Sequence, residues 1–183
     1  VMQQHPLSDF KFCPHCGNAD FHSHDAFSKV CGVCGFVFYP NAAAATVAVI
    51  VNERNELLCV RRSREPAQGT LDLPGGFVDP GESVTEGLCR EVREEVGLRV
   101  TKYSFLCSFP NQYPYAGHTV HTADMFFRCE VDAAQQPWAH DDVEAVCWIP
   151  WCELCPCDFG LNSIRQGLEY LQQNPSLILA KVE

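Results

Sequence analysis

The hydrophobic and polar positions of the chain follow strand-like and helix-like periods from about residue 42 onward. The longest apolar run, Ala42–Val51, has ten residues, about half of what a membrane-spanning helix needs, so it predicts a buried strand. A turn-like Asn-Glu-Arg-Asn stretch separates this strand from Glu56–Arg62, and we expect the two to form a hairpin. The pattern predicts further strands over residues 100–109, 121–131 and 143–149, and a final helix over about 161–172.

One segment combines a helical pattern with clear start and stop signals. Ser83-Val-Thr-Glu86 has the form of a capping box and Gly97 suits the left-handed position after a helix, so a helix is expected over residues 84–96. Its apolar residues recur every four positions and form the face to be buried: Val84, Leu88, Val92 and Val96. With only two helices among several strands, the pattern favours an α+β fold in which helices pack on a mixed sheet.

Residues 1–40 differ from the remainder of the chain. They hold four of the twelve cysteines and few aliphatic residues, so they need a staple other than an apolar core. Pro40 and Asn41 then interrupt the pattern before the first long strand. We therefore predict a small domain at residues 1–40 and a larger domain at residues 41–183.

The four cysteines of the small domain form two Cys-x-x-Cys pairs, each followed by glycine. Cys13 and Cys16 make the first pair, and Cys31 and Cys34 make the second. Four thiolates complete the tetrahedral shell of a structural Zn²⁺ ion. We predict a zinc ribbon, with reduced or redox-active thiols as the alternative. Because such a shell leaves no free position, the zinc would stabilise the fold and not take part in catalysis.

A second group of cysteines lies in the last quarter of the chain. It comprises Cys147, Cys152, Cys155 and Cys157. This group contains neither a second knuckle nor the glycine that accompanies one. Packed, reduced thiols are therefore expected there, and a second metal site is the weaker alternative.

Composition and charge restrict the classes of function. The chain is 46% hydrophobic and 20% charged, as in ordinary globular domains. Its net charge of −10 argues against a surface that coats nucleic acid, although divalent cations still permit a phosphate substrate. Val1–Phe10 is polar and lacks the apolar core of a targeting segment, so we expect a cytoplasmic protein that does not bind membranes.

The helix at residues 84–96 carries three glutamates suited to binding a cation. At about 100° per residue, Glu91, Glu94 and Glu95 share one sector of the helix, with Glu95 at the edge of the apolar face. Like charges at this spacing repel one another, and a carboxylate beside the core loses solvation. A Mg²⁺ ion would offset both costs. The alternative is an acidic face exposed to solvent.

The same segment resembles a known signature. Gly76, five residues, Glu82, seven residues and Arg90-Glu-Val-Arg-Glu-Glu-Val-Gly-Leu98 match the box of the Nudix hydrolase family at every defined position. The resemblance implies an α/β/α sandwich with a mixed sheet. It also implies hydrolysis of the diphosphate linkage of a nucleoside diphosphate joined to another group, by water that a metal ion activates. The implied ligands of Mg²⁺ or Mn²⁺ are Glu91, Glu94, Glu95 and the carbonyl of Gly75.

The residue that accepts the proton of water varies within the family. Glu94 or Glu95 can serve, and so can an acid on a later loop, where Asp142 matches best. Relatives usually carry glutamate at that place, so the shorter aspartate is a departure from the pattern. An exposed acidic turn is the alternative interpretation of Asp142.

A four-cysteine ribbon directly before such a domain resembles the NADH pyrophosphatase group. Pro40-Asn41 replaces that group's usual Pro-Arg, and Cys107–Gly117 lacks its Ser-Gln-Pro-Trp-Pro-Phe-Pro type array. Pro114, sixteen residues after Leu98, resembles ADP-ribose hydrolases instead. The expected substrate is ADP-ribose or an NADH/NAD-like dinucleotide. Alternatives are a hydrolase of dinucleoside polyphosphates or RNA caps, and a nucleotide-sensing binding module without catalysis.

Aromatic and basic residues outside the box are candidates for contact with this small-molecule substrate. Phe109, Tyr113 and Tyr115 fall in an expected loop and can stack on a base, with loop packing as the alternative. Arg61 can bind phosphate bidentately. Because neighbours on a strand point to opposite faces, at most one of Arg61 and Arg62 is expected to do so. The resemblance also allows a homodimer.

Overall fold

The computed structural model describes residues 5–115 and 117–179, so the first four residues of the polar N-terminal segment lie outside it. The chain divides into two compact units, Val1–Ala42 and Ala43–Glu183. Within the described residues, no helix has the length and apolar character needed to span a membrane.

The smaller unit is built on a three-stranded antiparallel sheet. Its strands, in spatial order, are β1 (Phe21–Ser23), β2 (Lys29–Cys31) and β3 (Val37–Phe38). Only a few side chains form its core, with two phenylalanines packed against them: Cys13, Phe21 and Cys31, then Phe36 and Phe38. So small a core cannot stabilise a domain by apolar burial alone.

The larger unit contains two three-stranded sheets and two longer helices. Its strands are β4 (Ala43–Ile50), β5 (Glu56–Arg62), β6 (Leu71–Asp72), β7 (Val100–Tyr115), β8 (His118–Val131) and β9 (Val143–Pro150). Its helices are α1 (Val84–Val96), η1 (Trp151–Glu153), η2 (Pro156–Asp158), α2 (Asn162–Gln173) and α3 (Ser176–Leu179). In the order β4-β8-β7, β4 runs parallel and β7 antiparallel to β8, whereas β6-β5-β9 is antiparallel throughout.

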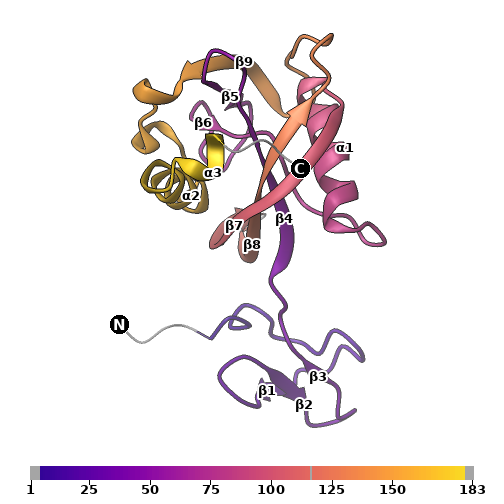
Figure 1. Ribbon diagram of the computed structural model, residues 1–183. Coiled ribbons are helices and arrows are strands. Elements are labelled where there is room, and N and C mark those ends of the chain that lie inside the picture. The colour runs from indigo at the N-terminus through magenta and orange to yellow at the C-terminus, as the bar shows by residue number, and fades with distance from the viewer. Residues whose placement is uncertain (1–4, 116, 180–183) are drawn as a thin grey trace. The chain divides into compact units, whose positions relative to one another are not determined.

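The strands lie between α1 and α2, as Figure 1 shows. Alternate residues of β4 enter two different cores because successive side chains point to opposite faces. Val47 and Val49 pack in the core that contains α2. Ala48 and Ile50 pack in the core that contains α1. The predicted α/β/α sandwich with a mixed sheet is therefore confirmed.

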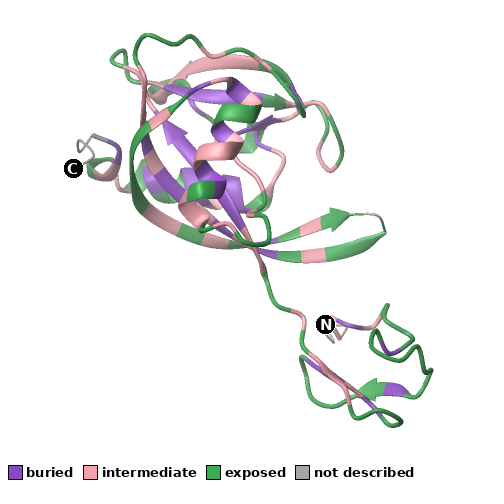
Figure 2. Ribbon diagram, turned by 90° about the vertical axis from the view of Figure 1, so that its right-hand side faces the viewer, coloured by how far each residue is buried: buried purple, intermediate pink, exposed green. Residues whose placement is uncertain are grey.

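The predicted helix over residues 84–96 is confirmed in its bounds and its caps. The Ser83 side chain accepts a hydrogen bond from the Glu86 N–H and the Glu86 side chain accepts one from Ser83, while Gly97 is left-handed at φ 69°. Leu88, Val92 and Val96 are buried. Figure 2 shows this buried side of α1 turned toward the strands.

The expected hairpin of the first two long strands is wrong. β4 and β5 belong to different sheets and share only one antiparallel bridge, Val51↔Leu57. β4 pairs along its whole length with β8, and β5 pairs with β6 and β9. Strands that are adjacent in sequence need not be partners, because β4 and β5 each find backbone hydrogen-bonding partners in strands farther along the chain.

The expected loop over Phe109–Tyr115 is also wrong, because these residues continue β7. They pair antiparallel with His118–Asp124 of β8, and Figure 2 shows this outer part of the hairpin as largely exposed. Pro110 and Pro114 suggest a loop by their lack of a backbone N–H. β7 lies at the edge of its sheet, and an edge strand tolerates such missing donors.

Candidate active site

The segment before α1 brings backbone groups close to the helical carboxylates. Gly75 (φ 147°) donates its N–H to Oε2 of Glu95 at 2.9 Å. A Cβ on Gly75 would lie 2.0 Å from the carbonyl oxygen of Thr46, and one on Gly76 would lie 2.7 Å from Cδ of Glu91. Only glycine permits this close approach of the loop to both β4 and α1.

Arg90 holds the acidic groups of this region in place. Its Nε and Nη2 donate to the two carboxylate oxygens of Glu82 at 2.8 and 2.9 Å. Its Nη1 donates to Glu91 at 2.8 Å and to Glu94 at 3.1 Å. The hydrogen bonds from Arg90 lower the pKa of Glu82. Arg90 is therefore a clamp for the carboxylates, and its bonds to Glu82 fix its own position.

Burial changes the proton affinity of two of the three helical glutamates. Desolvation raises the pKa of Glu91, against the opposing effect of Arg90. Desolvation raises the pKa of Glu95 to about 8, with the Gly75 N–H acting in the opposite direction. These two carboxylates are costly to keep ionised in the metal-free protein.

Glu91, Glu94 and Glu95 line a cavity of about 440 Å³. Nine carboxylates line it, against three guanidinium groups, those of Arg62, Arg64 and Arg90. An anionic diphosphate would be repelled from such a lining unless cations were also bound. Hard divalent cations prefer carboxylate and carbonyl oxygens. The donor set of Glu91, Glu94, Glu95 and the Gly75 carbonyl therefore fits Mg²⁺ or Mn²⁺.

Asp142 reaches the cavity because the β8–β9 connection is tied to the end of α1. The N–H groups of Trp138 and His140 donate to the helical carbonyls of Val96 and Glu95 at 3.2 and 3.0 Å. Asp142 itself pairs with the exposed Arg64 at 2.7 Å. Glu94, Glu95 and Asp142 thus line the same cavity, although they are far apart along the chain.

Of the two candidate arginines on β5, Arg62 lines the cavity, whereas Arg61 donates to the carbonyl of Gly69 and lies outside the lining. The register of β5 against β9 shifts between these two residues. Arg62 donates to Asp72 at 2.6 Å and to the Tyr113 hydroxyl at 3.2 Å. The strand pattern gave no sign of this bulge, so the sequence could not choose between the two arginines.

The three aromatic candidates occupy different environments. Tyr113 lines the cavity and meets Phe77 edge-on at 5.6 Å between ring centroids. Tyr115 also lines it but is 66% exposed. Phe109 lies outside the lining and packs against Phe126 and Tyr170. The structure thus brings Tyr113 and Tyr115 to the carboxylates, and leaves Phe109 in the core that contains α2.

Five buried polar residues of the cavity were missed by the sequence interpretation: Thr46, Asp72, Asn111, Thr122 and Asp124. Burial raises the pKa of Asp72, while Arg62 opposes that shift. A signal for Asp124 did exist in the sequence. It is a carboxylate next to the apolar residues Met125 and Phe126 within a predicted strand, and an unpaired charge is costly if such a strand is buried.

The Arg62–Asp72 pair is expected to contribute strongly to stability. Their side chains are 17% and 9% exposed, so Arg62→Ala would leave a buried carboxylate without its partner. We expect the free energy of unfolding to fall by about 3–5 kcal/mol in urea denaturation. Arg64→Ala, which removes the exposed pair with Asp142 (71% and 47% exposed), should cost less than about 1 kcal/mol. Equal losses would contradict this account.

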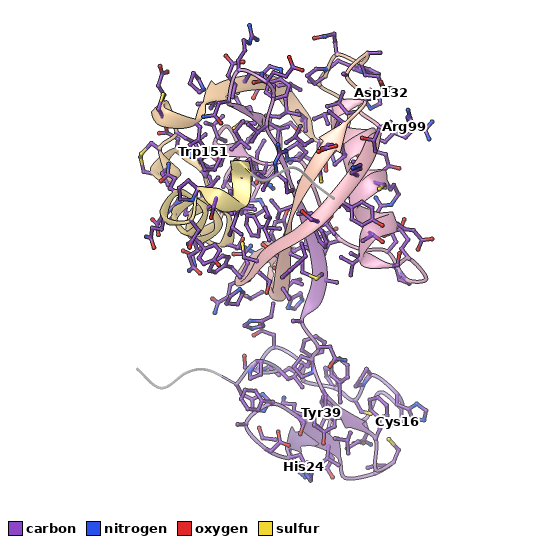
Figure 3. The ribbon with its side chains drawn as sticks, viewed as in Figure 1. Cys16, His24, Tyr39, Arg99, Asp132 and Trp151 are labelled. Carbon is purple, nitrogen blue, oxygen red and sulfur yellow. A yellow bond between two sulfur atoms is a disulfide. The ribbon has the colours of Figure 1, made fainter. Side chains whose placement is uncertain are left out.

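In the smaller unit, the four predicted zinc ligands converge. Their sulfur atoms all lie within 4.8 Å of one another, with 3.7 Å between Cys13 and Cys34 and 3.6 Å between Cys16 (labelled in Figure 3) and Cys31. Sulfurs about 2.3 Å from a tetrahedral zinc lie roughly 3.8 Å apart. Backbone N–H groups, first that of Cys34, lower the pKa of Cys31 to about 7. The donor set therefore fits Zn²⁺.

The second group of cysteines does not remain entirely reduced. Cys155 and Cys157 form a disulfide, so the expectation of four reduced thiols is wrong for this pair. Cys147 and Cys152 are free.

Comparison with known proteins identifies the class to which this fold and site belong. Residues 40–169 match the model of the NUDIX domain, and the chain belongs to the Nudix hydrolase family. In the solved structure of a MutT NUDIX hydrolase from Burkholderia pseudomallei, 97% of the chain superposes on 70% of this one, with 26% identity and a TM-score of 0.61. A NUDIX hydrolase from Nitrosomonas europaea shares the fold at a TM-score of 0.69 and 21% identity, over 91% of this chain and 92% of that one.

Curated relatives are similar over part of their length. The NAD-capped RNA hydrolase NudC of Chromobacterium violaceum is 32% identical over 138 residues, which cover 75% of this chain and 49% of that protein. The NudC protein of Vibrio parahaemolyticus is 29% identical over 124 residues, covering 68% of this chain and 47% of that protein. The chain therefore spans about half the length of these relatives.

Proposed function

We propose that this protein hydrolyses the diphosphate linkage of a nucleoside diphosphate joined to a second group, with ADP-ribose or an NAD-type dinucleotide as the substrate. The observation that carries the proposal is the meeting of Glu91, Glu94 and Glu95 with the Gly75 loop at one cavity. The similarity to NAD-capped RNA hydrolases supports an NAD-type diphosphate.

Different residues of the site would serve different steps of such a reaction. A bound Mg²⁺ or Mn²⁺ would neutralise the diphosphate and activate the attacking water. Glu91, Glu94, Glu95 and the Gly75 carbonyl would hold the cation, and Arg90 positions the first two glutamates through its hydrogen bonds. The oxygen of water bonds to one phosphorus as the bridging P–O bond breaks, and the departing phosphate keeps the bridging oxygen. The proton of water passes to Glu94, Glu95 or Asp142.

A substrate panel with Mg²⁺ tests the proposal. It contains ADP-ribose, NAD⁺, NADH, dinucleoside polyphosphates, nucleoside triphosphates and NAD-capped RNA, with products identified by mass in heavy-oxygen water. We expect AMP from ADP-ribose or a nicotinamide dinucleotide, with the label in a single product phosphate. Tight binding of these compounds without turnover would instead support a nucleotide-sensing module, and cleavage of the capped RNA alone would move the substrate class to RNA.

The proton acceptor can be separated from the metal ligands with single variants. Glu94→Gln, Glu95→Gln and Asp142→Asn would each be assayed for turnover and for Mn²⁺ affinity. A residue that only accepts the proton loses kcat but keeps the affinity for the metal, whereas a ligand loses both. If Asp142→Asn keeps wild-type kcat, Asp142 is not the acceptor.

A further inference from the structure

The inner face of the β7–β8 hairpin changes from apolar to polar where it enters the active-site cavity. Phe109 and Phe126 occupy this face within the core that contains α2. Asn111 is the direct cross-strand partner of Thr122, and Phe109 is the partner of Asp124. Because alternate residues on a strand share a face, Asn111, Thr122 and Asp124 continue that face into the cavity that they line.

These polar residues are almost completely buried. Asn111 is 7% exposed, Thr122 is 4% exposed and Asp124 is 5% exposed. The Asp124 carboxylate accepts hydrogen bonds from the hydroxyls of Thr122 and Ser163, each at 2.5 Å. Both donors are uncharged, and no cation within residues 5–115 and 117–179 forms an ion pair with Asp124. Arg62, on the same cavity, is already paired with Asp72.

Asn111 lines the cavity, and its side chain forms no hydrogen bond with the described residues. Its amide is not fully enclosed, because Ser28 Oγ is the only completely buried side-chain nitrogen or oxygen without a partner among those residues. The Asn111 amide therefore keeps free hydrogen-bonding groups at the cavity wall, and the nearby buried carboxylate of Asp124 lacks a counter-charge, which destabilises a folded protein. Their presence side by side on a cavity wall is explained if a ligand supplies the missing partners.

We propose that Asn111 and Asp124 bind the nucleobase of the substrate by its hydrogen-bonding edge. Asp124 accepts an N–H of the base, and Asn111 donates its amide N–H to the neighbouring acceptor atom, an arrangement that matches any base with adjacent donor and acceptor groups. This inference rests on the proposed function, because it places the diphosphate at the α1 carboxylates. The base then lies on the side of the cavity formed by β7, β8 and α2.

The assignment can be tested without catalytic turnover, by measuring the binding of compounds that resemble the products of the proposed reaction. Calorimetry with Mg²⁺ would compare AMP, GMP, nicotinamide mononucleotide and ribose 5-phosphate on the full chain. Asn111→Ala and Asp124→Asn are expected to weaken the best-bound nucleotide about tenfold or more. Gln112→Ala removes a neighbouring exposed amide, and it should bind that nucleotide as the wild type does. Ribose 5-phosphate should bind weakly and equally to all four proteins.

The outcomes separate the two proposals. Unchanged nucleotide affinity in Asn111→Ala, with a wild-type melting temperature, would overturn the base assignment even if diphosphates are hydrolysed. Equal weakening of ribose 5-phosphate would overturn it in favour of sugar binding. Variant-sensitive nucleotide binding in a protein that hydrolyses no diphosphate would support the assignment and refute the catalytic proposal. Should Asp124→Asn fail to fold, the Asn111→Ala result decides.

Discussion

Replacing Glu95 with glutamine is expected to lower kcat for diphosphate hydrolysis by about a hundredfold or more. Glu95 accepts the Gly75 N–H and lines the cavity between the loop and α1. The amide retains one acceptor oxygen for that hydrogen bond but loses the negative charge that a cation needs. Steady-state assays with Mg²⁺ measure the effect. Glu169→Gln, at an exposed position of α2, is the matched control and should retain wild-type kcat.

The same substitution is expected to stabilise the metal-free protein at alkaline pH. Burial raises the pKa of Glu95 from 4.5 to about 8, so the folded state binds this proton more tightly than the unfolded state does. The stability of the wild type should therefore fall as pH rises from about 4.5 to 8, by up to about 1.4 kcal/mol per pH unit. Glutamine has no proton to lose, so the part of this pH dependence that is due to Glu95 should disappear.

Thermal unfolding in a chelator at pH 4.5 and pH 8 checks this expectation. The variant should match the wild type at the lower pH and melt at a higher temperature at pH 8. Adding Mg²⁺ should raise the melting temperature of the wild type more than that of the variant, because only the folded wild type offers the full ligand set. A variant that melts below the wild type at pH 8 would contradict the burial argument, and wild-type turnover would remove Glu95 from the mechanism.

Cys34→Ser is expected to reduce bound zinc from about one ion per chain to nearly none and to unfold the smaller unit. In domains of this size the free energy of zinc binding supplies the free energy of folding. Among the described residues of this unit, the apolar cluster consists of three buried residues with two phenylalanines beside them. Metal analysis and hydrogen exchange measure the two effects. Amides of β1, β2 and β3 should lose protection. Those of β4 and β8 should keep it, because both cores of the larger unit consist of its own residues.

Cys152→Ser is the control for this experiment, because Cys152 is an exposed free thiol of the larger unit. It should retain both the zinc and the exchange protection. If the Cys34→Ser protein retains both its zinc and its protection from hydrogen exchange, fewer than four thiolates suffice to bind the ion. If the reduced wild-type protein contains no zinc, the prediction of a zinc ribbon is ruled out.

Local features of this protein were predictable because their causes lie within a few neighbouring residues. The Ser83–Glu86 capping box and Gly97 define the ends of α1. The helical period then places Glu91, Glu94 and Glu95 on one side, whatever surrounds the helix. The spacing of the two cysteine pairs predicts their convergence in the same way. The roles of these residues as metal ligands stay predictions.

Tertiary structure decided which distant residues share the cavity. The pairing of β4 with β8, the bulge that selects Arg62 over Arg61, and the extension of β7 through two prolines all depend on partner strands. Asn111 and Asp124 become neighbours through the register of β7 against β8. The sequence by itself determined the helix, its carboxylates and the cysteine knuckles, since short-range hydrogen bonding and periodicity govern them. The substrate side of the cavity was decided by strand register, which no local pattern encodes.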